Sequence, residues 1–229
     1  MQPKVALCLM MKNITYLLII LTFFSSCAEQ NKKKDKELTL ETKEFILEPV
    51  QLILKNPTNE TLLDWSNYHT SLDSSFSIVD FFLEHSDTLN FIQGNVFGIF
   101  DQEFDKIYND FIVYSPDKKR YLDFDSYQWT MNEDNTVMFS PDQEINLIDV
   151  NKQTVTRIGF NGPSQWVDNA FWENDTTIVL LESSSEKELR ISKIDIVNKC
   201  QKTYKYRDTL NLNSKYSELR LSNKGLKTE

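Results

Sequence analysis

The first half of the chain carries apolar residues at the spacing of a helix. Four of them fall three or four residues apart, which places them on one helical face. These residues are Leu62, Trp65, Tyr68 and Leu72. Residues 100–111 repeat the spacing, whereas the apolar cluster at residues 78–83 fits either a buried helix or a short strand. We therefore predict that residues 38–110 are mainly helical.

From about residue 111 the pattern changes to short apolar runs separated by turn residues. Three of these runs are typical of strands. They are residues 145–150, 177–181 and 191–196. Ser-Pro-Asp occurs at 115–117 and again at 140–142, and proline suits the first corner of a turn. We predict antiparallel strands over residues 111–213 and a polar tail over residues 214–229. The predicted fold class is α+β, with a helical N-terminal half followed by an antiparallel β-rich C-terminal half.

Part of the β-rich half repeats itself. Three positions recur at a constant offset of 46 residues, and two tryptophans recur at an offset of 43. The pairs are Ile145 and Ile191, Ile148 and Ile194, Asp149 and Asp195, and Trp129 and Trp172. With the two Ser-Pro-Asp turns, residues 111–206 resemble the Tol-type β-propeller repeats of bacterial periplasmic proteins. Propeller repeats have a period of roughly 40–50 residues, so the resemblance implies propeller-blade-like meanders.

The repeat also departs from that family. The two Ser-Pro-Asp copies are only 25 residues apart and lack the glycine that usually follows them. A full propeller ring does not fit in a chain of 229 residues. A plain antiparallel meander, in which similar turns have similar sequences, explains the pattern equally well.

Residues 1–26 have the three parts of a secretory signal. Lys4 and Lys12 are the only charged residues in this segment, residues 14–24 are almost continuously apolar, and the small Ser25 and Ser26 follow. The apolar run is far shorter than the roughly 20 residues that a membrane-spanning helix needs. The segment therefore predicts export.

The end of this segment resembles the lipobox of bacterial lipoproteins, in which small residues precede an obligatory cysteine. The match is Ser25-Ser26-Cys27, with Phe24 where leucine is usual, a looser form that occurs in Bacteroidota. The resemblance implies that the signal is cut before Cys27 and that Cys27 carries acyl chains such as palmitate. Two or three acyl chains bind a membrane stably. The alternative is an ordinary secretory signal with a cysteine near the cleavage site.

Residues 27–37 are polar and charged, so they predict a tether between the lipid and the folded part. The resemblance implies an exported protein anchored in the cell envelope, at the outer membrane. Lipoproteins of this kind that reach the cell surface often carry an acidic patch after the cysteine. Here Lys32, Lys33 and Lys34 occupy that position, so the side of the membrane stays open.

Composition limits the partners and the covalent chemistry of the exported part. Without the signal the chain has 34 acidic and 23 basic side chains, a formal charge of −11, which disfavours nucleic acid. Cys8 leaves with the signal and Cys27 takes the lipid, so Cys200 has no intramolecular disulfide partner. The hydrophobic fraction of 40% suffices for a packed core.

Motifs for catalysis are missing from the sequence. His69 and His85 are the only histidines, and no further ligands stand at zinc-site spacing. Cys200 has no evident histidine partner, and the chain has no nucleophile elbow or phosphate-binding glycine loop. We predict no catalytic residue, no metal site and no cofactor.

Aromatic residues give the remaining candidate site. Trp166 and Trp172 flank Asp168 after a loop that begins at Asn161-Gly162-Pro163. Exposed tryptophans beside a carboxylate can stack on a sugar or anchor a peptide, and buried ones would belong to the core.

Together these features predict a membrane-anchored lipoprotein without enzyme activity that interacts with an envelope protein. Two alternatives stay open. One is a glycan-binding or divergent glycan-hydrolysing lipoprotein that uses Trp166 and Trp172. The other is an immunity or inhibitor lipoprotein, whose acidic charge would suit a basic target.

Overall fold

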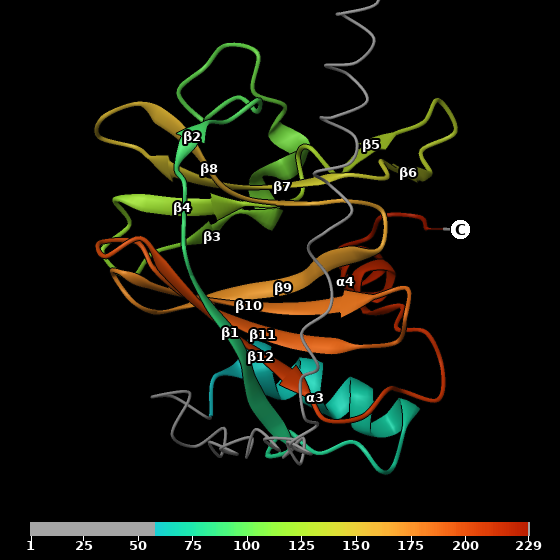
Figure 1. The fold of residues 1–229 in the computed structure, drawn as a ribbon. Helices are drawn as coiled ribbons and strands as arrows, with labels where there is room; N and C mark the ends of the chain where they lie inside the picture. The colour runs from blue at the N-terminus through green and yellow to red at the C-terminus, as the bar shows by residue number, and fades with distance from the viewer. Residues whose placement is uncertain (1–57, 229) are drawn as a thin grey trace, which may run out of the picture. The chain divides into compact units, whose positions relative to one another are not determined.

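The computed structural model describes residues 58–228, and the predicted signal, Cys27 and the tether lie outside the described residues. Most of the described elements are strands, and Figure 1 shows their arrangement. In chain order the elements are α3 (Glu60–Leu72), β1 (Phe81–Thr88), β2 (Ile92–Gln93), the 3-10 helix η1 (Lys106–Phe111), β3 (Val113–Tyr114), β4 (Arg120–Asp123), β5 (Trp129–Met131), β6 (Val137–Phe139), β7 (Gln143–Asp149), β8 (Thr154–Asn161), β9 (Gln165–Asn174), β10 (Thr177–Ser184), β11 (Leu189–Asp195), β12 (Cys200–Tyr206) and α4 (Tyr216–Asn223).

The strands form two five-stranded sheets and one hairpin. Sheet A has the order β1-β12-β11-β10-β9 and sheet B has the order β2-β8-β7-β4-β3. Strands β5 and β6 form a two-stranded hairpin inserted between β4 and β7, and the Val137 backbone N–H of β6 also donates to the Lys227 carbonyl at 2.8 Å. Each sheet is therefore a meander of four strands whose last strand also pairs with an earlier segment of the chain. All pairs between these strands are antiparallel.

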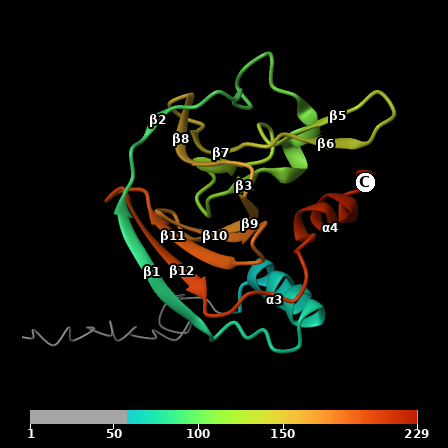
Figure 2. The ribbon, with the colours of Figure 1, turned by 45° about the vertical axis from the view of Figure 1, so that its right-hand side comes forward.

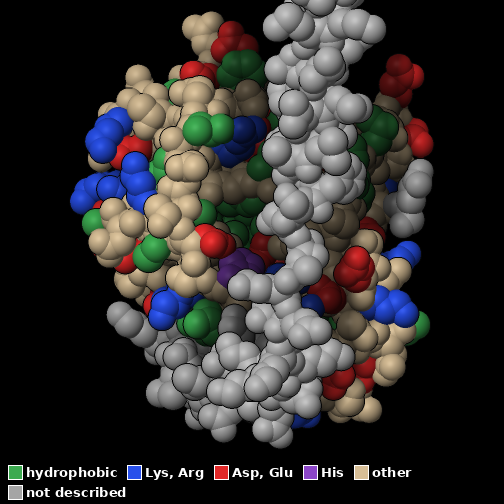
Figure 3. Space-filling view, in the orientation of Figure 1, with side chains coloured by type: hydrophobic (Ala, Val, Ile, Leu, Met, Phe, Trp, Pro, Cys, Tyr) green, Lys and Arg blue, Asp and Glu red, His purple; other side chains and the backbone are tan. Residues whose placement is uncertain are grey.

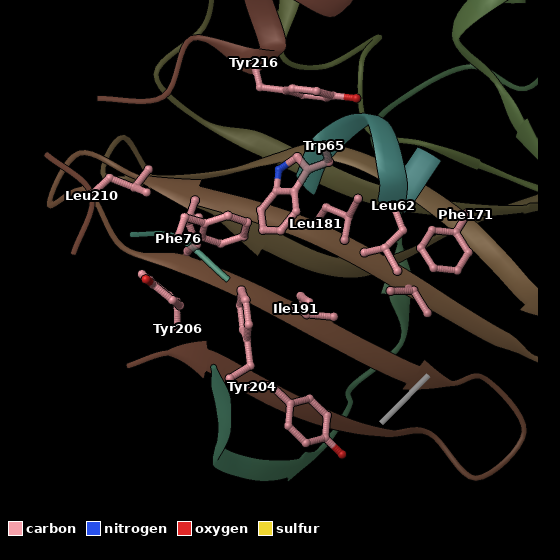
Figure 4. Close-up of a cluster of buried hydrophobic side chains, with 13 residues drawn as sticks. Leu62, Trp65, Phe76, Phe171, Leu181, Ile191, Tyr204, Tyr206, Leu210 and Tyr216 are labelled. Carbon is pink, nitrogen blue, oxygen red and sulfur yellow. The ribbon is translucent and has the colours of Figure 1, made fainter. Parts of the chain in front are cut away.

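Two apolar clusters hold the layers together. The first lies between the sheets, where residues such as Leu147 and Ile158 of sheet B pack with Leu180 and Ile194 of sheet A. The second lies on the other face of sheet A, where Trp65 of α3 is fully buried (Figure 4). Figure 2 shows α3 on the side of sheet A that faces away from sheet B. Each large apolar side chain buried here stabilises the fold by about 2 kcal/mol.

Helix α3 forms where the apolar spacing predicts a helix. The Asn59 side chain accepts a hydrogen bond from the Leu62 backbone N–H, which caps the first turn. Leu62, Trp65 and His69 are the buried residues of the helix, and Leu62 and Trp65 pack in one apolar cluster with residues of sheet A. The helix ends at Leu72, after which Asp73 adopts an extended conformation.

The prediction of a mainly helical N-terminal half is wrong. Residues 81–88 form strand β1, which pairs with β12 from Phe81 opposite Tyr206 to Thr88 opposite Cys200. Residues 98–111 form turns and the short η1 rather than an α-helix. The described part is mostly antiparallel β structure, so the α+β class is wrong as well.

Long-range packing explains the error. The partner of β1 lies more than 110 residues later in the chain, so local spacing carries no sign of the pairing. The aromatic residues of 100–111 keep helical spacing, but they pack in two different apolar clusters. Phe100 packs beside the outer face of sheet B, whereas Tyr108 and Phe111 pack against Trp129 of the hairpin.

The segment predicted to be a polar tail contains helix α4. Tyr216, Ser217 and Leu221 are its buried residues, and Figure 2 shows the helix beside β9. The Arg220 guanidinium makes two hydrogen bonds, of 3.0 and 2.6 Å, to the Asp125 carboxylate. Polar side chains of α4 form hydrogen bonds with buried polar partners and hold the helix in place. Its sequence is therefore as polar as that of an unstructured C-terminal tail, which explains the wrong prediction.

The 46-residue repeat has a structural counterpart. Strands β7 and β11 are the third strands of their meanders, and Asp149 and Asp195 accept backbone hydrogen bonds in the turns that follow. Gln153 and Lys199 end these turns with φ of 53° and 50°. The resemblance to propeller repeats remains a prediction.

Two other repeated features are not equivalent in the structure. The Ser115 copy of Ser-Pro-Asp closes the β3–β4 hairpin, whereas the Ser140 copy connects β6 to β7. Trp129 begins the small hairpin and Trp172 lies near the end of β9 in sheet A. Similar turn chemistry therefore occurs here at unrelated places in the fold.

Candidate functional site

The three residues of the predicted ligand platform all lie on β9, but they have different surroundings. Trp172 is only 8% exposed, belongs to the core between the sheets, and donates its indole N–H to the Val113 carbonyl at 2.9 Å. Trp172 therefore has no face open to a ligand. Trp166 is half-buried and lines a cavity, so it is the tryptophan that a ligand can reach.

Asp168 is fully buried and accepts hydrogen bonds from four side chains. The donors are the indole N–H groups of Trp65 at 2.9 Å and Trp166 at 3.0 Å, the Ser217 hydroxyl at 3.0 Å and the Ser183 hydroxyl. Burial raises the pKa of the carboxyl group, and the donors oppose this effect. Asp168 thus joins α3, α4, β9 and β10 and is not available to a ligand.

A β-bulge in β9 explains why Asp168 points into this position. Leu181 of β10 is opposite Asn169, but the next residue of β10, Glu182, is opposite Val167. Asp168 is therefore the extra residue on β9, and such a bulge redirects a side chain. The side of sheet A that carries the helices is contacted by three residues of β9. Asn169 lies 3.5 Å from the Tyr216 hydroxyl of α4, Asp168 accepts from Ser217 of α4, and Trp166 donates to Asp168.

Trp166 opens onto a cavity of about 260 Å³ between the β8–β9 connection, the β5–β6 hairpin and α4. Its walls combine aromatic and proline rings with neutral amides and hydroxyls. The lining residues are Gln128, Phe139, Ser140, Pro141, Gln143, Gly162, Pro163, Gln165, Trp166, Ser217 and Glu218.

A second cavity, of about 460 Å³, adjoins the first. It is lined by Asn132, Val137, Met138, Phe139 and Glu218. Phe139 and Glu218 line both cavities, so the two form one depression, which we call the hairpin groove. Met138 is 55% exposed and Phe139 is 38% exposed. Glu218 is the one ionisable side chain among the described residues that line the groove.

Two buried carboxylates fix the walls of the groove. Asp168 holds α4 through Ser217, and Asp125 holds it through Arg220. Asp125 also accepts the indole N–H of Trp129 at 2.8 Å, which ties α4 to the start of the hairpin. Buried polar contacts therefore fix α4 and the hairpin, which form two of the walls of the groove.

The histidines and the cysteine lie apart from the groove and apart from each other. His69 is buried in α3, where its Nδ1–H donates to the Trp65 carbonyl at 2.8 Å and its Nε2 lies 3.0 Å from the Ser214 hydroxyl. His85 lies on β1, 3.3 Å from Asp87 and 3.7 Å from Glu84. Cys200 is half-buried at the start of β12. No group of three or more potential metal ligands occurs within residues 58–228.

Sequence reasoning found Trp166 but missed the other residues of the groove. Met138 and Phe139 stand within residues 111–213, which are predicted only as strands, and Glu218 stands in the segment predicted to be a tail. These residues come together because the hairpin and α4 pack against one apolar cluster that contains Val137 and Leu221. No local signal marks that contact.

Comparison with protein-family models, with curated proteins and with solved structures finds no match to this chain. Within the described residues, neither α3 nor α4 has the length and apolar character of a membrane-crossing helix.

Proposed function

We propose that this chain is a membrane-anchored lipoprotein of the cell envelope that binds another envelope protein in the hairpin groove, without catalysing a reaction. The single observation that carries the proposal is the groove itself. It is preformed and combines a half-buried tryptophan with exposed apolar side chains next to a carboxylate.

The side chains of the groove are those that anchor protein interfaces. Tryptophan and other aromatic residues supply large contact areas at a small cost in conformational entropy, and methionine adapts to the shape of its partner. Trp166 is held by its bond to Asp168, so little of its freedom remains to be lost on binding. Met138 and Phe139 present their side chains at the rim.

Glu218 defines the chemistry of the partner. It stands in both cavities, and the described lining residues include no lysine, arginine or histidine. A partner segment that fits the hairpin groove has an apolar side chain in the cavity beside Trp166 and a basic side chain near Glu218. The formal charge of −11 on the exported part favours the same kind of partner.

The lipid anchor explains how such a module meets an envelope protein. Acylation of Cys27 would hold the chain at the membrane, and residues 27–37 would separate the folded part from the lipid surface. This part of the proposal rests on the sequence.

The test is recovery of a complex from crosslinked membranes of the native host, with the full-length chain carrying Met138→Asp. Burying a charge at the rim of the interface should abolish the specific complex that the wild-type chain gives. Val197→Asp is the matched control, because Val197 is an exposed apolar residue in the β11–β12 turn, outside the groove. Equal recovery of the same complex with both variants would overturn the groove as the binding site.

A further inference from the structure

A third cavity, separate from the lining of the hairpin groove except for Gln165, lies on sheet A. It has a volume of about 280 Å³, and we call it the polar cavity. Its lining residues are Glu84, His85, Gln165, Arg190, Ser192, Gln201 and Thr203. All of them carry polar side chains, and they come from β1, β9, β11 and β12. Figure 3 shows the face of the molecule on which a histidine lies among acidic and basic side chains.

Strand register brings these residues together. Thr203 of β12 stands directly opposite His85 of β1 on one side and opposite Ser192 of β11 on the other. The three residues form one row across three neighbouring strands. Ser192 and Thr203 are 0% and 2% exposed, so they form the floor of the cavity.

A β-bulge in β1 turns a second residue toward the cavity. Leu83 is opposite Tyr204 and His85 is opposite Thr203, so Glu84 is the extra residue on β1. Adjacent residues of a regular strand point to opposite faces, but here both Glu84 and His85 line the cavity. Bulges of this kind often redirect side chains at binding sites.

The floor of the cavity covers a buried carboxylate. Glu182 is 4% exposed and accepts hydrogen bonds from Ser192 at 2.6 Å and from Gln165 at 3.2 Å. Burial raises the pKa of this carboxyl group. Burying a carboxylate costs free energy, and here Ser192 and Gln165, two residues of the cavity lining, offset that cost with hydrogen bonds.

The charges around the cavity disfavour an ionic ligand. Arg190 donates to the Glu84 carboxylate at 2.8 and 3.2 Å and lies 2.7 Å from the Glu188 carboxylate. Because two carboxylates already engage its guanidinium, little positive potential remains for an anion. The same contacts leave Glu84 and Glu188 little capacity to bind a cation.

Four planar polar groups line the cavity: the carboxylate of Glu84, the amides of Gln165 and Gln201, and the guanidinium of Arg190. Glu84 and Arg190 bond each other, and the amide N–H groups of Gln165 and Gln201 donate to protein oxygens. The carbonyl oxygens of the two glutamines are therefore the acceptors that suit the hydroxyl groups of a neutral ligand. We infer that the polar cavity binds a neutral polyhydroxylated ligand, a single sugar ring or a comparable polyol. This inference does not rest on the proposed function: sugar binding in the polar cavity and protein binding in the hairpin groove are tested separately, and one can be wrong while the other is right.

The test is titration of the full-length chain, in a detergent without a sugar headgroup, with glucose, galactose and N-acetylglucosamine, followed by ligand-observed NMR. Inorganic phosphate and ethylamine serve as anionic and cationic probes. We expect at least one sugar to bind in the millimolar range and neither ionic probe to bind. If no sugar binds, or if phosphate binds instead, the inference is wrong.

Two variants assign the binding to the cavity. Gln201→Leu removes an amide that donates to both Ser192 and Thr203, and should weaken sugar binding about tenfold. His85→Ala changes only the exposed rim and should weaken sugar binding several-fold. This second variant keeps the test decisive if Gln201→Leu does not fold. Gln93→Leu, at an exposed glutamine on β2, is the matched control and should bind like the wild type. Unchanged binding in both cavity variants would place the sugar elsewhere.

Discussion

Ser217 on α4 donates a hydrogen bond of 3.0 Å to Asp168 on β9, and this contact places α4 against sheet A. The same carboxylate accepts from Trp65 of α3, so one buried side chain sets the position of both helices. The wall of the hairpin groove therefore depends on a buried residue that does not line it.

Replacement of Asp168 should destabilise the whole fold. Asp168→Asn keeps the shape of the side chain, but its NH₂ group cannot accept from the surrounding donors, which leaves buried polar groups unpaired. We expect the free energy of unfolding to fall by about 3 kcal/mol. Urea denaturation measures the change, and Asp208→Asn, at an exposed position, is the control. Equal stability of the two variants would show that Asp168 does not organise the helices.

His69 should make stability depend on pH. Burial disfavours the imidazolium ion and lowers the pKa of His69 from 6.5 to about 4. Between these values the unfolded chain binds more protons than the folded one, so the free energy of unfolding falls as the pH falls from 6.5 toward 4. The full effect is about 3 kcal/mol.

Comparison with a variant isolates this effect from other titrating groups. Buried Asp123, Asp168 and Glu182 have raised pKa values, so they favour the folded state as the pH falls toward their range. Their contribution is common to the wild type and His69→Gln. We expect the stability difference between the two proteins to narrow by about 3 kcal/mol from neutral pH to about pH 4. A difference that stays constant with pH would contradict the assignment to His69.

Acylation at Cys27 is tested by metabolic labelling with a fatty acid. The wild-type chain should incorporate the label and sediment with membranes, whereas Cys27→Ser should do neither, because serine lacks the thiol at which we propose acylation. Cys200→Ser is the matched control, since Cys200 lies at the start of β12 and should leave labelling unchanged. Equal labelling of the wild type and Cys27→Ser would remove the lipid anchor from the proposal.

The sequence predicts local features of this fold better than the contacts between distant segments. Helix α3 and the turns after Asp149 and Asp195 follow from local spacing and turn chemistry. Strand β1 does not, because its partner β12 is far away in the chain and its own residues fit a helix equally well.

The candidate site shows the same limit. The sequence predicts Trp166 and Trp172 as ligand contacts because both are aromatic residues near a polar loop. In the structure Trp172 is buried in the core, and only Trp166 lines the groove. Asp168 was expected beside a ligand and instead bonds four side chains of the protein, because a bulge turns it inward. Glu218 reaches the groove because α4 is held by Ser217 on Asp168 and by Arg220 on Asp125, contacts between residues 49 and 95 positions apart.

Site-specific photo-crosslinking tests the central claim most directly. A photoreactive amino acid is placed at Met138, in the groove, or at Val197, in the β11–β12 turn, of the full-length chain in its native membranes. We predict a discrete crosslinked envelope protein from position 138, which disappears when Glu218→Lys is added, and no discrete product from position 197. The same product from both positions, or none from position 138, would contradict binding in the hairpin groove.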